Sequence, residues 1–356
     1  MVGQELSVPV VFVSSHARAG GSERYLETLV QHLGDGWVRL VVCLEDGPLV
    51  ERLRAAGVTT EVVPTSARPW GIVGSARRLR RTLARWDPAL VHANGIKAAI
   101  TSVLATRRPI VWVKHDFSYD GLLARLVAMR CRMVIGVSEA VTQTFTRRRK
   151  VEVVHNGISP HEVDRVAGRR LLEDALGQPA DEVVALVGRL DPFKGHLELL
   201  GAAARLQRPT LRLVFIGGPD PSHAAYERSL RRLAGDRATF LGYREDAVAL
   251  IGGSDLLAIP TPSPEGFPYA GLEAMAVGTP IVGYAHGGLP ELAGECGRLV
   301  KPGRFDRLAD EIERLLSDSD LWARLADCGR DRVAREFSLE RMVEAMKDRY
   351  RRAAGK

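Results

Sequence analysis

The sequence predicts an α/β protein built from two doubly wound domains, each organised around a parallel sheet. Three observations predict this class. Short apolar runs bounded by turn residues alternate with longer segments that have the 3.6-residue period of a helix. The alternation occurs twice, on either side of a polar segment at 159–182 that contains Gly177 and Pro179. The chain of 356 residues is also too long for one ordinary hydrophobic core.

The first series of elements opens with the apolar run Val10 to Ser14, which is typical of a buried strand. A loop with Gly20 and Gly21 follows, and a helical pattern begins after it with Ser22 as the expected N-cap. The same alternation continues to the end of the series. Strands are predicted at 39–44, 59–63, 90–92, 110–113, 133–137 and 151–154, and helices at 48–56, 72–85, 97–105, 121–129 and 139–146.

The second series repeats the alternation after the polar segment. Strands are predicted at 183–187, 212–216, 239–241, 256–259, 280–284 and 298–300, and helices at 196–206, 224–234, 247–251, 269–277, 306–317 and 321–336. We therefore expect a first domain over 1–165 and a second over 166–337. A basic amphipathic helix over 337–352 closes the chain, and we expect residues 338–356 to pack back on the first domain.

Composition indicates a soluble globular protein, with 46% hydrophobic and 26% charged residues. No run approaches the roughly 18 apolar residues of a membrane span. Val8 to Val13 is apolar, but no basic segment precedes it, so it is interpreted as a strand rather than a signal peptide. The four cysteines lack metal-ligand spacing and are expected to be free thiols in a reducing cytoplasm, at positions 43, 131, 296 and 328.

Positive charge is concentrated in the first half of the chain. Residues 1–165 hold 23 Lys and Arg against 15 Asp and Glu, whereas the remaining residues hold 27 against 28. Two basic runs stand out, Arg77 to Arg81 and Arg147 to Lys150. Such runs attract anionic membranes, nucleic acid or phosphorylated substrates, or they are simply solvated helix faces. No nucleic-acid motif accompanies them, so nucleic-acid binding is not expected.

The stretch Thr261 to Glu291 contains the most informative chemistry. Glu265 lies on the loop after an expected strand, and Glu273 projects from the helix that follows. Pro268 suits the first position of that helix, because the N–H that proline lacks is not needed there. Two carboxylates beside the free amides of a helix start combine an anion site with acceptors for sugar hydroxyls.

Other polar residues follow the expected strands, where parallel sheets bind ligands. Gly20 and Gly21 suit a close approach of phosphate or sugar to the backbone. The loop is not G-x-G-x-x-G, and no Walker G-x-x-x-x-G-K occurs, so neither a dinucleotide nor a P-loop site is expected. Polar residues also follow the strands near 92, 113 and 154, at Asn94, Lys114, His115, Asp116 and Asn156.

Taken in order, these motifs resemble those of the retaining glycosyltransferases of family 4, of the group 1 type. That family has the GT-B fold, in which two Rossmann-like domains face a central cleft. The resemblance covers nearly the whole chain and is more specific in the second half. It rests on Gly20-Gly21-Ser22-Glu23, Val154-His155-Asn156-Gly157-Ile158, Gly188-Arg189-Leu190 with Lys194-Gly195, Phe240-Leu241-Gly242, Glu265-Gly266-Phe267-Pro268 through Glu273-Ala274-Met275-Ala276, and Gly287-Gly288-Leu289-Pro290-Glu291.

The resemblance implies roles for these positions. Arg189 and Lys194 would neutralise charge on the diphosphate of a nucleotide sugar. Glu265 would bind the hydroxyls of the transferred sugar, Glu273 the ribose hydroxyls, and His115 would lie beside the sugar from the facing domain. Further donor contacts are expected from Gly20, Gly21, Gly242, Tyr243, Arg244, Gly266, Phe267, Pro268, Tyr269 and Ala270. Acceptor contacts are expected from Asn94, Lys114, Asp116 and Asn156.

The implied reaction moves a hexosyl unit from a UDP- or GDP-linked donor to a hydroxyl acceptor, with front-face substitution and retention at the anomeric carbon. The departing phosphate oxygen takes the acceptor proton, so no protein nucleophile is needed. No cofactor and no metal are expected. Asp318-Ser319-Asp320 has a D-x-D form, but it lies between two expected helices rather than at a strand end.

Alternatives stay open at this point. The chain fits a nucleotide-sugar epimerase of the same fold, or a non-catalytic protein that binds sugar nucleotides or anionic membrane. The acceptor is either a small soluble molecule, such as an antibiotic intermediate or a phosphorylated polyol, or a lipid-linked one. In the second case the basic first domain would contact the inner face of the membrane peripherally. His155 replaces a frequent proline of the family, a departure that is expected to change only the loop. The cluster around His115 is more charged than in many relatives, so we expect an unusual acceptor.

Overall fold

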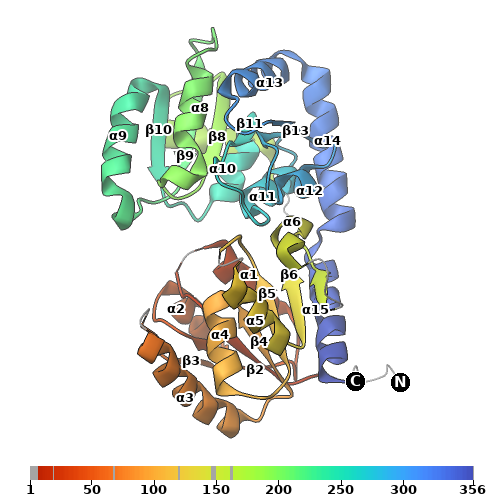
Figure 1. The fold of residues 1–356 in the computed structure, drawn as a ribbon. Helices are drawn as coiled ribbons and strands as arrows, with labels where there is room; N and C mark the ends of the chain where they lie inside the picture. The colour runs from red at the N-terminus through yellow and green to blue at the C-terminus, as the bar shows by residue number, and fades with distance from the viewer. Residues whose placement is uncertain are drawn as a thin grey trace. The chain divides into compact units, whose positions relative to one another are not determined.

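The computed structural model describes residues 7–18, 20–66, 69–118, 121–145, 150–160 and 163–355. The chain divides into two compact units (Figure 1). The first unit comprises Met1–Gly157 and Leu339–Lys356, and the second comprises Ile158–Ser338. The crossing between the units therefore lies at 157/158, eight residues before the boundary that we expected from composition.

The first unit is built on a seven-stranded sheet with the order β3-β2-β1-β4-β5-β6-β7, in which every neighbouring pair is parallel. Its strands are β1 (Val10–Ser14), β2 (Val38–Cys43), β3 (Thr60–Val62), β4 (Leu90–Asn94), β5 (Ile110–Lys114), β6 (Met133–Gly136) and β7 (Val151–Val153). Its helices are α1 (Gly21–His32), α2 (Pro48–Ala55), α3 (Pro69–Trp86), α4 (Ile96–Ala105), α5 (Leu122–Arg130), α6 (Glu139–Thr142) and α15 (Leu339–Ala354). The strand order reverses between β1 and β4, and such a reversal opens a crevice at the carboxyl ends of the two strands.

The C-terminal helix α15 packs on the first unit. The Tyr350 side chain is fully buried, and its hydroxyl lies 2.7 Å from Nδ1 of His92 on β4. The Tyr350 ring also contacts Phe12 of β1 edge-on, with ring centroids 6.1 Å apart. Residues 339–354 therefore complete the core of the unit that residues 7–157 begin.

The second unit has a six-stranded parallel sheet with the order β10-β9-β8-β11-β12-β13. Its strands are β8 (Glu182–Val187), β9 (Leu211–Ile216), β10 (Ala238–Gly242), β11 (Leu256–Ile259), β12 (Ile281–Tyr284) and β13 (Gly297–Val300). Its helices are α7 (Arg165–Leu176), α8 (His196–Ala203), α9 (Ala224–Ala234), α10 (Ala247–Gly253), α11 (Tyr269–Val277), α12 (Leu289–Ala293), α13 (Phe305–Ser317) and α14 (Ser319–Glu336). Here the order reverses between β8 and β11.

Two helices of the second unit were not predicted. Helix α7 lies in the segment that reads as a polar boundary, with Asp164 as N-cap and Gly177 in the left-handed conformation at its end. Its buried face is narrow because Gly168 meets the backbone of Gly253 on α10, so few apolar side chains are needed there. The short helix α12 starts at Leu289, within the motif at 287–291, for which no helix was predicted.

The expectation of four free thiols is wrong for two of the cysteines. Cys296 and Cys328 form a disulfide with their Cα atoms 5.2 Å apart, which joins the residue before β13 to α14. Their separation of 32 residues conceals this proximity in the sequence. Cys43 and Cys131 are free and buried, and burial raises the pKa of each thiol to about 12. Over the described residues, the structure contains no helix with the length and apolar character of a membrane span.

Candidate functional site

The best-defined cluster of polar side chains lies at the switch point of the second sheet, where β8 and β11 are neighbours. The loop 188–195 follows β8, and the loop 260–268 follows β11. Gly195 adopts a φ of +82°, and a Cβ there would come within 2.1 Å of the Pro260 carbonyl oxygen. Only glycine allows the two loops to come this close.

Lys194 and Glu265 meet at this point although 71 residues separate them. The Lys194 ammonium donates to Oε1 of Glu265 at 2.9 Å, and about a quarter of each side chain is exposed. The aliphatic part of Lys194 packs over Gly188, where a Cβ would come within 2.9 Å of it. The pair is therefore held in place yet open to an anionic ligand.

Arg189 is oriented by two aspartates that sequence reasoning did not single out. Its Nη1 donates to Asp220 at 2.9 Å, and its Nη2 lies 3.3 Å from Asp191. Asp191 is buried and also accepts from the Phe193 amide, so the same carboxylate holds both the turn and the Arg189 guanidinium in place. Hydrogen bonds from Ser222, and then the charge of Arg189, lower the pKa of Asp220. The sequence signal was the Asp-Pro step at 191–192, which is typical of a capped turn.

The loop that contains Glu265 is fixed through its backbone. The Gly288 amide donates to the Glu265 carbonyl at 2.8 Å. Gly287 has a φ of +61°, and a Cβ there would lie 2.3 Å from the same carbonyl oxygen. The Gly-Gly pair of the motif at 287–291 therefore supports Glu265, a role that its spacing did not reveal.

Helix α11 starts directly after this loop, and one detail of our prediction is wrong. Pro268 is the N-cap of α11, with a ψ of 118°, rather than its first helical residue, because the chain is still extended there. No side chain caps the helix start. Amides at the start of a helix attract anions. Ala270 belongs to the first turn of α11, and Gly266 is a buried residue of the preceding loop.

The side chains around this helix start face inward. Phe267 is buried against Phe337, with ring centroids 5.2 Å apart, and Tyr269 is buried as well. These two residues can therefore offer a ligand mainly their backbone. Glu273 is also buried, at 4% exposure.

The donor candidates Gly242, Tyr243 and Arg244 lie at the far end of the same sheet edge. Gly242 ends β10, and its carbonyl accepts from the Gly217 amide after β9 at 2.8 Å. Tyr243 follows with its ring 69% exposed, whereas Arg244 is turned onto Asp246 by two hydrogen bonds of 2.8 and 2.6 Å. Three strand spacings separate β10 from β11, which is about 14 Å at roughly 4.8 Å each. The site is therefore elongated, with an aromatic ring near one end and the ion pair at the other.

In the first unit, the switch point between β1 and β4 holds two of the predicted residues together. His115 Nε2 lies 2.6 Å from Oδ1 of Asn94, and Asn94 Nδ2 donates to the Ser22 carbonyl at 2.9 Å. Because that carbonyl can only accept, Asn94 presents its oxygen to His115, and the proton of His115 lies on Nε2. Nδ1 is then the acceptor nitrogen of the ring. Burial lowers the pKa of His115 to about 4, so the ring is neutral near pH 7.

The start of α1 differs slightly from our prediction. Gly20, rather than Ser22, is the N-cap of α1, and Gly21 is its first residue. Ser22 instead donates its hydroxyl to Glu23 at 2.9 Å. A Cβ on Gly20 would come within 2.5 Å of the same Glu23 carboxylate, so a larger residue there would require this carboxylate to move.

The other acceptor candidates do not join His115 and Asn94. Lys114 is buried, and its ammonium donates to the main-chain carbonyl of Asp116. The Asp116 side chain is exposed and accepts from the Ser118 amide. Asn156 follows β7, three strands from β4. Of the two predicted basic runs, Arg147 to Arg149 lie outside the described residues, whereas Arg77 to Arg81 belong to α3.

A cationic cluster at the same sheet edge was missed. Glu45, after β2, accepts from the Ala17 amide at 3.1 Å and lies 3.2 Å from His16, 3.4 Å from Arg18 and 3.9 Å from Lys97. Burial opposes its ionisation, but the Ala17 amide and His16 lower its pKa. These residues come from the loop after β1, the loop after β2 and the start of α4, so no spacing in the sequence brings them together.

Metal-ligand geometry does not occur in the described ranges, where no three His, Cys, Asp or Glu side chains converge. Asp318 of the D-x-D sequence caps α14 through a 2.8 Å hydrogen bond to the Leu321 amide.

Cations and a helix start at the switch point of a doubly wound α/β unit are features of a class of proteins that bind phosphorylated ligands. Comparison with known families is more specific. Residues 19–162 match the family described as Glycosyltransferase Family 4, and residues 171–332 match the one described as Glycosyl transferases group 1. The chain belongs to this glycosyltransferase family, and its fold is GT-B.

Individual relatives agree. The chain is similar to the D-inositol 3-phosphate glycosyltransferase of Mycobacterium tuberculosis, with 36% identity over 239 residues that cover 63% of this chain and 49% of the relative. It thus spans about half the length of the curated relatives it matches. Anabaena HepE in complex with UDP superposes with a TM-score of 0.86 at 25% identity, over 96% of this chain and 99% of HepE. A Rickettsia africae glycosyltransferase superposes with a TM-score of 0.85 at 19% identity, over 98% and 99%.

Proposed function

We propose that the protein is a retaining glycosyltransferase that moves a hexosyl unit from a nucleotide-diphosphate sugar to a hydroxyl acceptor. One observation carries this proposal: Lys194 and Glu265 meet at the switch point of the second sheet, with Arg189 on the same loop as Lys194. A diphosphate needs cations, and a sugar needs carboxylate acceptors for its hydroxyls. The site offers both within one hydrogen bond of each other.

The elongated form of the site supports a nucleotide donor. The exposed ring of Tyr243 is suited to stack on a base, and Arg189 and Lys194 are suited to the diphosphate. Glu265 would receive the sugar hydroxyls, and the buried Glu273 the ribose. UDP is favoured over GDP because HepE, the relative described above, was solved in complex with UDP.

Front-face substitution fits the arrangement of charges. In that step the acceptor oxygen bonds to the anomeric carbon while the bond from this carbon to the phosphate oxygen breaks. The acceptor proton passes to the departing phosphate oxygen, whose charge Arg189 and Lys194 stabilise. Glu265 is ion-paired with Lys194, which suits a positioning role better than nucleophilic attack. Neutral His115, with Nδ1 as acceptor, would bind a sugar hydroxyl.

For the acceptor, the cluster of His16, Arg18 and Lys97 around a single carboxylate favours a molecule that carries an anionic group. The name of the Mycobacterium relative, a D-inositol 3-phosphate glycosyltransferase, supports a phosphorylated polyol. A lipid-linked acceptor is the second candidate.

The test is a thermal-shift panel with UDP, GDP, ADP and their glucose conjugates, followed by proton NMR of the product. We expect a shift of several degrees with the uridine ligands and an α-configured product from an α-linked donor. No shift with any nucleotide would overturn the proposal, and an inverted product would overturn the retaining step. Release of nucleotide and altered sugar without acceptor would instead identify an epimerase.

A further inference from the structure

We propose that helices α3, α4 and α5 of the first unit form a docking surface for an anionic lipid bilayer. The docking surface consists of an exposed apolar stripe on α5 and a cavity lined by arginines between the three helices. Neither feature takes part in the proposed transfer reaction, so the inference does not depend on the proposed function. The three helices lie on one face of the first sheet (Figure 1).

The apolar stripe is an unusual feature of α5. This helix buries Ala124, Val127 and Ala128 toward its own unit and leaves its largest apolar side chains outside. Leu122, Leu126 and Met129 are 73%, 51% and 62% exposed. Spacings of four and three residues place the three side chains along one side of the helix. Single exposed leucines are ordinary, but a continuous apolar stripe marks an interaction surface.

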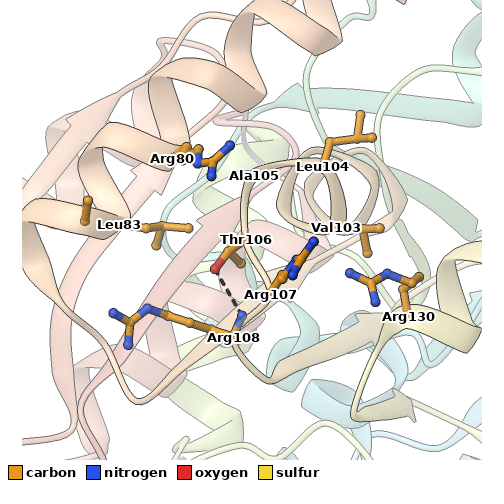
Figure 2. Close-up of a pocket in the computed structure, with 10 residues that line it drawn as sticks. Arg80, Leu83, Val103, Leu104, Ala105, Thr106, Arg107, Arg108 and Arg130 are labelled. Carbon is orange, nitrogen blue, oxygen red and sulfur yellow. Dashed lines mark hydrogen bonds between the residues drawn. The ribbon is translucent and has the colours of Figure 1, made fainter.

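The cavity continues the surface from the end of α5. It has a volume of about 660 Å³ and is lined from α3 by Arg80, from the end of α4 by Leu104 and Arg107, and from the end of α5 by Arg130 (Figure 2). Arg107 and Arg130 lie near each other in Figure 2. The side chain of Leu104, which also lines the cavity, is 56% exposed. A basic hollow therefore adjoins the apolar stripe.

The charged residues that line this cavity are all arginines. Helices α3, α4 and α5 contain seven Arg and one Lys and no Asp or Glu. Some of their cations are paired from outside, as Arg85 is with Glu61 and Lys97 with Glu45. Arg108, which also lines the cavity, pairs with Asp87. Within the residues that the structure describes, Arg80, Arg107 and Arg130 have no carboxylate partner.

Charge complementarity selects the occupant. Unpaired arginines attract the phosphates of an anionic membrane, each contributing on the order of fivefold in affinity near the surface. An apolar stripe on a short helix can enter the boundary between head groups and acyl chains while the arginines stay at the phosphates. A surface of this kind lies on a membrane rather than spanning it.

The experiment is flotation of the full chain with two vesicle types, pure phosphatidylcholine and a mixture containing 30% phosphatidylglycerol (roughly the anionic content used to mimic bacterial membranes). We expect binding to the anionic vesicles at 50 mM salt, at least tenfold weaker binding at 500 mM salt, and little binding to phosphatidylcholine alone. No binding to anionic vesicles at low salt would overturn the proposal and point to a protein partner for the stripe.

Two sets of variants locate the surface. Arg80→Glu, Arg107→Glu and Arg130→Glu together should reduce the affinity on the order of hundredfold. The matched control, Arg228→Glu, Arg232→Glu and Arg237→Glu, changes the net charge equally in the second unit, on exposed residues. Leu126→Ser with Met129→Ser should reduce binding at both salt concentrations, with Leu197→Ser and Leu233→Ser as controls. Equal losses in the control sets would overturn the assignment, and circular dichroism would verify that each variant is folded.

Discussion

The arginines of α7 in the second unit and those that line the cavity between α3, α4 and α5 in the first unit have different surroundings. In the second unit, surface helices are joined to their neighbours by ion pairs. Arg165 and Arg169 of α7 share Asp255 at 2.7 Å each, and Arg298 pairs with Glu311 of α13 at 2.7 Å. In the first unit, α3, α4 and α5 contain no carboxylate of their own. The same residue type therefore stabilises packing at α7 and provides excess positive charge around the cavity between α3, α4 and α5.

The difference follows from what each surface has to do. A guanidinium between carboxylates loses its attraction for external anions, because its charge is already compensated. A guanidinium without such a partner keeps that attraction but contributes little to folding. The switch point of the second unit combines the two conditions, since Arg189 and Lys194 are oriented by carboxylates yet remain partly exposed.

The largest effect is expected from Lys194→Ala. Removal of the ammonium withdraws stabilisation from the leaving phosphate and leaves Glu265 without its partner. We expect turnover to fall on the order of 10² to 10³-fold, which is the usual loss for one group that stabilises transition-state charge. Steady-state kinetics with the donor identified in the thermal-shift panel would measure it. Lys301→Ala, at an exposed lysine of the same unit, is the control. Unchanged turnover in Lys194→Ala would remove this residue from the site.

A second prediction tests whether the ion pairs of α7 stabilise the second unit. Asp255 accepts from Arg165, Arg169 and the Val183 amide, so Asp255→Ala leaves three donors without their acceptor. We expect a loss of about 3 kcal/mol in the free energy of unfolding, measured in urea. Arg81→Ala on α3 should change it by less than about 0.5 kcal/mol. Similar losses in the two variants would contradict the contrast between the units.

A smaller effect is the loss of stability at acidic pH. Burial lowers the pKa of His92 to about 3 and that of His115 to about 4, both in the first unit, and that of His196 in the second unit to about 4. These folded-state values lie below the usual 6.5, so the stabilisation is complete above pH 6.5 and is lost as pH falls toward 4. Between pH 7 and 5, each histidine should lower the free energy of unfolding by up to about 2 kcal/mol, because the unfolded chain takes up the proton.

Urea unfolding at pH 7, 6 and 5 measures this loss. In His196→Phe, the free energy of unfolding should depend less steeply on pH, by the equivalent of about one bound proton. The reason is that Phe fills the same site beside Phe215 without titrating. The two histidines of the first unit should then account for the remaining slope. A slope that is the same in the variant would show that His196 does not titrate as its burial implies.

Local pattern predicted most elements because it depends on neighbours in the chain. Helix α9 and strand β11 begin and end where their periodicity and flanking turn residues predicted. The residues at the carboxyl ends of the strands were also found from sequence, since a parallel sheet brings such ends to one edge. Helix α7 was not predicted, because it packs against α10 through a glycine rather than through a broad apolar face.

The sequence by itself determined the fold class, the family resemblance and the residue types at the ends of the strands. Only the tertiary structure decided which of these meet. It paired Lys194 with Glu265 and Asn94 with His115, gathered three basic side chains around Glu45, and joined Cys296 to Cys328. It also decided that the leucines of α5 are exposed. The period of apolar residues can be seen in the sequence, but whether another segment covers them cannot. The physical reason is common to all these cases: pairing and burial depend on contacts between segments far apart in the chain, which local spacing does not record.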